Sequence, residues 1–168
     1  LGNAHDILWG IDYRESRGRV GSGDFIAILP EQRTWRMGSV FLQDEITLRP
    51  DRLRLILGAR LEHNNFTGFE PQPNLRLLWT PSPQLTLWGA ASRAARTPSR
   101  AELDAVVNLS VIPATSRTPA VLLRNVPQDD HLLEDERVRA FELGWRQQVD
   151  PMLSFDVALF HNLYDRLR

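Results

Sequence analysis

Alternation of apolar and polar residues with a period of two constrains this chain more than any other feature. From residue 53 to residue 61 every odd position is apolar: Leu53, Leu55, Leu57, Ala59 and Leu61. The even positions between them hold two arginines, an isoleucine and a glycine. Because side chains alternate between the two faces of a strand, this segment predicts a β-strand with one apolar face and one mostly polar or small face.

The same alternation recurs in six other segments. Their apolar positions are Ile7, Trp9, Ile11 and Tyr13; Val40, Leu42, Ile46 and Leu48; Leu75, Leu77 and Trp79; Leu85, Leu87, Gly89 and Ala91; Phe141, Leu143 and Trp145; and Phe155, Val157, Leu159 and Leu163. Asp44 and His161 are exceptions, since each falls on the apolar side of its strand. The predicted fold class is therefore all-β, an antiparallel meander of about seven long strands.

The connections between these strands are expected to alternate in length. Tight turns are predicted at residues 49–52, 81–84 and 150–151, where proline presets the turn dihedral and Asp or Ser bonds its own backbone. Residues 16–34, 63–72 and 97–137 are predicted to be long connections, and the prolines of the last one disfavour long strands there. Outer-membrane barrels have short periplasmic turns and longer extracellular loops. We therefore expect this meander to be part of a transmembrane β-barrel.

Composition excludes several other classes of protein. A net charge of -1 gives no basic excess for nucleic acid, and the absence of cysteine leaves neither disulfides nor thiolate metal sites. The mean hydropathy is -0.31, and no apolar run approaches the roughly 18 residues of a membrane helix. Alternating barrel strands also keep a low mean hydropathy, so this value is compatible with a membrane barrel.

Catalytic and metal-binding motifs give no support for an enzyme. Ser92 and Ser99 lie in no G-x-S-x-G elbow, and the four histidines lack H-E-x-x-H spacing. Asp129, Asp130 and His131, with the acidic residues that follow, offer ligands for a divalent cation. We interpret this stretch as a solvated acidic loop. We therefore expect no enzymatic activity, no cofactor and no metal site.

Six motifs resemble barrel strands of TonB-dependent receptors of the iron-complex type. They are FLQDEI at 41–46, LGARLEHN at 57–64, PNLRLLWTP at 73–81, SRAARTPS at 92–99, ELGWR at 142–146 and FHNLYD at 160–165, in the family's order. The stretch 125–134 departs from the family pattern, because it lacks the usual glycine and carries extra acidic residues.

The resemblance implies a barrel of about 22 strands with a plugged lumen. Residues 1–168 would then be a partial β-barrel domain, with the plug and the remaining strands absent. The implied function is energy-coupled uptake of iron-siderophore-like complexes across the bacterial outer membrane. The implied partners are outer-membrane lipid and lipopolysaccharide, the ferric complex, and the TonB energy-coupling protein through a missing N-terminal region. A passive porin-type barrel and a soluble antiparallel β binding domain are the alternatives.

Five arginines are candidates for binding an anionic ligand on the extracellular side: Arg93, Arg96, Arg100, Arg117 and Arg124. Guanidinium forks bind carboxylate or catecholate oxygens well. Binding to lipopolysaccharide phosphates is the alternative role.

A second set of charged residues is expected to face the lumen: Arg54, Arg60, Glu62, Arg76, Glu142 and Arg146. Opposite charges on one sheet face stabilise each other by about 0.2–1 kcal/mol per pair. These residues are therefore predicted to pair across neighbouring strands, and the resemblance adds that such a polar wall would hold the plug.

Overall fold

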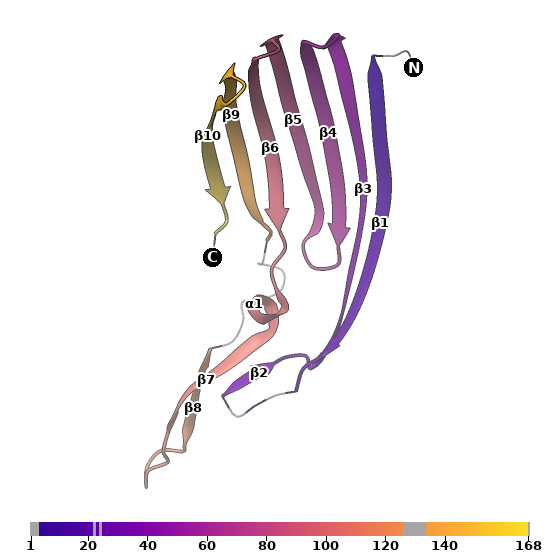
Figure 1. Ribbon diagram of the computed structural model, residues 1–168. Helices are drawn as coiled ribbons and strands as arrows, with labels where there is room; N and C mark the ends of the chain where they lie inside the picture. The colour runs from indigo at the N-terminus through magenta and orange to yellow at the C-terminus, as the bar shows by residue number, and fades with distance from the viewer. Residues whose placement is uncertain (1–3, 22, 24, 126–133, 168) are drawn as a thin grey trace.

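The computed structural model describes residues 4–21, 23, 25–125 and 134–167. Seven long strands form one antiparallel sheet in the order β1-β3-β4-β5-β6-β9-β10, and they lie side by side in a single layer (Figure 1). The strands are β1 (His5–Arg19), β3 (Gln32–Arg49), β4 (Leu53–Asn64), β5 (Gly68–Ser82), β6 (Leu85–Arg96), β9 (Glu136–Asp150) and β10 (Leu153–Asp165). The predicted meander of about seven long strands is confirmed.

A second, three-stranded sheet is built from the long connections. Its strands are β2 (Ile26–Ile28), β7 (Ala105–Ile112) and β8 (Val121–Asn125), in the order β2-β7-β8. One short helix, α1 (Arg100–Asp104), precedes β7. These elements lie beyond the lower end of the large sheet in Figure 1, which we call the loop end; the opposite end is the turn end. In the described part of the chain no helix is long and apolar enough to cross a membrane.

Helix α1 was not expected from the alternation pattern, yet it has a local sequence cause. Ser99 and Glu102 form a capping box, in which the Ser99 side chain accepts from the Glu102 N–H and the Glu102 carboxylate accepts from the Ser99 N–H. This S-x-x-E pattern satisfies two backbone donors at the start of the helix.

The strand register gathers the alternating apolar residues on one face of the large sheet. Residues directly opposite each other in an antiparallel pair lie on the same face. One row across six strands consists of Ile46, Leu55, Leu77, Gly89, Leu143 and Leu159. These side chains are largely uncovered, since Leu143 is 64% and Leu159 is 65% exposed. A contiguous apolar face of this extent requires another apolar phase against it.

The polar face of the sheet also contains aromatic rings that lie over glycines. A Cβ atom at Gly144 would be 2.0 Å from Cε2 of Trp88, and one at Gly10 would be 2.5 Å from Cε1 of Phe41. Glycine is therefore required at these positions, because the ring of the neighbouring strand occupies the space of its side chain.

The connection expected at residues 63–72 is short, so that prediction is wrong. Strands β4 and β5 pair as far as Asn64 opposite Gly68, and only residues 65–67 lie between them. The Asn64 side chain accepts the N–H groups of Phe66 and Thr67, and Gly68 has φ +81°. An Asn side chain that bonds its own backbone and a glycine at positive φ close a tight turn.

Two prolines explain why the sequence at the start of β5 does not predict a strand. Pro71 and Pro73 belong to β5 and keep an unbroken register with β4. The β5–β6 pairing, however, reaches only to Asn74 opposite Ser92. Because a proline has no N–H to donate, the two strands separate beyond this pair, and a seam opens between β5 and β6 toward the loop end.

Candidate ligand-binding site

A cavity of about 580 Å³ lies where the polar face of the sheet meets the segment that leads into α1. This volume is within the range of small-molecule sites, about 300–1,000 Å³. Its walls combine apolar and cationic side chains, among them Trp35, Met37, Phe66, Arg17, Arg33, Arg96 and Arg100. Anionic groups with flat apolar parts would find both kinds of contact here.

Asp104, the last residue of α1, binds two arginines, Arg100 of α1 and Arg33 of β3. This carboxylate is 1% exposed; it accepts from Arg100 Nε at 3.1 Å and from Arg33 Nη1. Arg100 also donates to the carbonyls of Gly18 and Pro30. Arg100 therefore ties α1 to the end of β1 and to the segment that precedes β3, which is a structural role.

Arg96 lies between two carboxylates. It donates to Glu136 at 2.9 and 3.0 Å and to Glu102 at 3.3 and 2.6 Å. Hydrogen bonds from Arg96 and from Ser99 lower the pKa of Glu102 to about 2. An incoming anion would have to share or replace these partners of Arg96.

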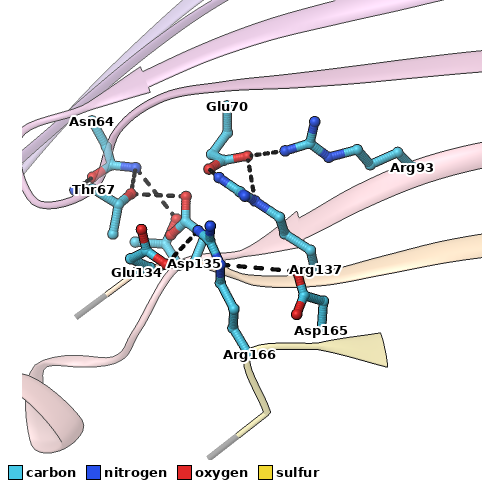
Figure 2. Close-up of polar contacts among 10 residues, drawn as sticks. Asn64, Thr67, Glu70, Arg93, Glu134, Asp135, Arg137, Asp165 and Arg166 are labelled. Carbon is cyan, nitrogen blue, oxygen red and sulfur yellow. Dashed lines mark hydrogen bonds and ion pairs between the residues drawn. The ribbon is translucent and has the colours of Figure 1, made fainter. Parts of the chain in front are cut away.

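Arg93 belongs to a separate ion cluster in the seam between β5 and β6 (Figure 2). Glu70, which is 3% exposed, accepts from Arg93 Nη2 at 2.8 Å and from Arg137 Nε at 3.2 Å. A second bond joins Arg137 Nη2 to the other oxygen of Glu70. Side-chain ion pairs thus join β5 to β6 and β9 where the backbone ladder between β5 and β6 has ended.

Asp135 completes this polar cluster beside the β4–β5 turn (Figure 2). Its Oδ2 accepts from the Thr67 hydroxyl at 2.8 Å, and Asn64 Nδ2 donates to the Thr67 and Thr97 hydroxyls at 2.8 and 3.4 Å. Burial raises the pKa of Asp135. These contacts hold the returning end of the β6–β9 connection against the β4–β5 turn.

The structure does not bring the five predicted ligand-binding arginines together. Arg96 and Arg100 line the cavity, and Arg93 lies in the Glu70 cluster. Arg117 precedes β8 in the connection that follows β7, and Arg124 lies on β8 opposite Asn108. Neither of these two lines the cavity.

Sequence reasoning missed several residues of the cavity, among them Arg17, Arg33, Trp35 and Phe66. Arg17 and Arg33 lie in the region 16–34 that was expected to be a loop, and Trp35 follows it directly. Strands β1 and β3 nevertheless pair through this region as far as Arg19 opposite Gln32. Arg33, Trp35 and Met37 occupy alternate positions, a pattern typical of a strand. This pattern could have identified Arg33 and Trp35 from the sequence.

All six residues predicted to face the lumen share the polar face of the sheet by register. Their closest contacts are Arg54 with Glu45 at 2.8 Å, Arg60 with Asp12 at 3.0 Å and with Glu62 at 3.8 Å, Arg146 with Asp156 at 3.4 Å, and Arg76 over the Trp88 ring at 5.9 Å. Glu142 lies opposite Ala90 and Phe160.

The acidic stretch Asp129 to His131 lies outside the residues that the structure describes. Within the described ranges, no group of three or more His, Cys, Asp or Glu side chains is placed to hold a metal ion.

Comparison with known proteins decides between the classes of barrel. A family model for the β-barrel of TonB-dependent receptor-like proteins matches residues 1–167. The chain belongs to this family. Its members are bacterial outer-membrane proteins, so the apolar face of the sheet faces lipid, the polar face lines the lumen, and the loop end is extracellular. Neither the passive porin-type barrel nor the soluble β domain is favoured by this result.

Solved receptor structures have the same strand arrangement. A variant of the ferric enterobactin receptor PfeA from Pseudomonas aeruginosa is 21% identical, with 98% of this chain and 24% of that chain covered and a TM-score of 0.74. The siderophore receptor PirA from Acinetobacter baumannii is 18% identical, with 95% and 24% covered and a TM-score of 0.73. This chain thus spans about a quarter of the length of these receptors. No curated protein sequence matched it.

Proposed function

We propose that this chain forms part of the wall of an outer-membrane receptor that takes up anionic ferric complexes of the siderophore type. The observation that carries this proposal is the cavity at the extracellular end of the lumen, where arginines and aromatic rings converge. A PfeA structure in complex with enterobactin is among the similar structures, which supports this ligand class.

The chemistry of the cavity suits a large anion with flat apolar parts. The Arg96 side chain is 54% exposed, so its guanidinium group remains accessible beside its carboxylate partners. Arginine forks match planar oxygen pairs. Trp35 and Phe66 add aromatic surface to the cavity, with Arg14 5.5 Å from the ring centroid of Trp35 and Arg33 4.4 Å from that of Phe66. The ferric ion is already chelated in such a complex, so the protein needs no metal ligands of its own.

The partners follow from the same proposal. Transport of a scarce ligand against a gradient requires energy, for which the family depends on the TonB protein; the contact would be made by a region outside this chain. Outer-membrane lipid and lipopolysaccharide would cover the apolar face. Uptake of an intact complex breaks no covalent bond, so we assign no catalytic residue.

Binding of a ferric catecholate complex to the protein as the cell makes it tests this proposal. Trp35→Ala and Arg96→Gln should each weaken binding by about tenfold, the equivalent of one stacking or charged contact. Arg124→Gln, which removes the same charge from β8, should leave the dissociation constant unchanged. Equal effects of all three substitutions would contradict a ligand site in this cavity.

A further inference from the structure

The carboxylate of Glu62 belongs to the wall of the candidate cavity, on the polar side of β4. Glu62 is one of the lining residues, and its side chain is 14% exposed. The register places Glu62 opposite Ser39 of β3. Two other lining residues, Met37 and Trp35, lie further along β3 toward the loop end. Glu62 therefore lies at the inner end of the cavity, deeper in the lumen than these two side chains.

Neither cross-strand neighbour of Glu62 supplies it with a hydrogen bond. Ser39 lies opposite on β3, but its hydroxyl donates to the carboxylate of Asp12 at 2.9 Å. Glu70 lies opposite on β5 and is itself an acid. Like charges directly opposite each other on a sheet face are destabilising. The strands on both sides thus leave the Glu62 carboxylate without a donor.

The two neighbours of Glu62 on the same face of β4 are also engaged elsewhere. Arg60 donates to Asp12 at 3.0 Å, and its Nη2 is 3.8 Å from Oε2 of Glu62, which is beyond hydrogen-bond distance. The amide of Asn64 donates to two threonine hydroxyls. Within the described ranges the Glu62 carboxylate accepts no hydrogen bond. A largely buried carboxylate at the inner end of the cavity therefore keeps its acceptor capacity unused.

The cavity thus presents charges of opposite sign from different strands. Arg96 of β6 has an exposed guanidinium group, whereas Glu62 of β4 is a largely buried acceptor. Both line the cavity, although β5 separates their strands in the sheet. A ligand that satisfies both groups needs anionic oxygens at one place and a positively charged hydrogen-bond donor at another.

We propose that Glu62 selects, among anionic ferric complexes, those that carry a primary ammonium group on the scaffold that links their iron-binding groups. An ammonium group offers three donors, and its hydrogen bonds to a carboxylate are stronger than those between neutral groups. A complex without this group would bring only negative charge to a carboxylate whose ion pair with Arg60 is long. The inference rests on the proposed uptake function and specifies a feature of the ligand that this function leaves open.

Two ferric tris-catecholate complexes built on the same scaffold test the proposal. One carries an aminomethyl arm, and the other carries the same arm N-acetylated and therefore neutral. Quenching of tryptophan fluorescence measures their binding to the complete receptor. The parent should bind the ammonium complex about tenfold more tightly than the acetylated complex, as expected for one charged hydrogen bond. Glu62→Gln should abolish this preference, chiefly by weakening the binding of the ammonium complex.

Two further variants separate the role of Glu62 from general effects of charge. Glu142→Gln removes the same charge from the polar face outside the cavity, so it is the matched control and should keep the preference. Arg96→Gln should weaken the binding of both complexes alike and leave the ratio of their dissociation constants unchanged. Heat-modifiable migration on gels verifies that each variant is folded.

The outcomes distinguish this inference from the proposed function. A preference that persists in Glu62→Gln would overturn the inference. An equal loss of affinity for both complexes would also overturn it, because Glu62 would then hold another part of the receptor. If both complexes bind through Arg96 but the parent does not distinguish them, the inference fails and the proposed function stands. If the parent binds neither complex, the proposed function fails and the inference fails with it.

Discussion

Glu70 and Arg137 form a two-point ion pair across the seam where the hydrogen bonds between β5 and β6 have stopped. Arg93 donates to the same carboxylate, so one buried acid holds three strands together. The seam exists because Pro71 and Pro73 give β5 no N–H to donate. The ion cluster replaces backbone pairing at the extracellular end of the wall.

Removal of this carboxylate should destabilise the barrel. Glu70→Ala leaves two half-buried guanidinium groups without their shared anion, and loss of one partner of a buried ion pair costs about 3–5 kcal/mol. Equilibrium unfolding in urea in the presence of lipid vesicles measures this loss. Glu142→Gln, on the same polar face, should change the free energy of unfolding by less than about 0.5 kcal/mol. If the two variants are equally stable, the cluster does not hold the seam.

Gly144 should tolerate no side chain, because Trp88 occupies that space. Gly144→Ala should force the ring away and lower the free energy of unfolding by about 1–3 kcal/mol, as expected for overpacking. Gly21→Ala is the control, since nothing lies within 4 Å of a Cβ atom there. Urea unfolding of both variants, followed by tryptophan fluorescence, distinguishes them. A Gly144→Ala protein as stable as the control would show that the ring does not lie over this strand.

Acid should loosen helix α1 through Glu102. The pKa of this carboxyl is lowered from 4.5 to about 2 by Arg96 and Ser99, so its contribution to stability is complete above pH 4.5 and is lost as the pH falls toward about 2. A nitroxide on Ala101→Cys, in a chain without other cysteines, should become more mobile in that interval. Glu102→Ala, which removes both the cap on Ser99 and the ion pair with Arg96, should be mobile at every pH. A spin label whose mobility is the same at pH 6 and at pH 2 would refute this account.

The strands could be predicted because their cause is local. Alternation along each strand places Leu55, Leu77 and Leu143 on one face, and the register then joins them in one row. The cause of helix α1 is also local, because the capping box of Ser99 and Glu102 is visible in the sequence. The short β4–β5 turn was missed because Pro71 and Pro73 disfavour a strand in the sequence. In the structure they are tolerated, since at these positions β5 pairs with β4 alone.

The candidate site could be predicted only in part, because its contacts are not local. Thr67 and Asp135 are 68 positions apart in the chain, and Arg33 and Asp104 are 71 apart. Sequence reasoning found Arg96 and Arg100 from their place at a strand exit. It gave no means of knowing that Arg93 turns to Glu70 or that Trp35 and Phe66 border the cavity.

Uptake of ⁵⁵Fe as a ferric catecholate complex by cells that make this protein, with and without a functional TonB protein, tests the central claim most directly. If the protein is an energy-coupled receptor, uptake should saturate with ligand concentration and should be lost when TonB is absent. Uptake that rises in proportion to concentration and is unchanged without TonB would contradict the account and indicate a passive barrel.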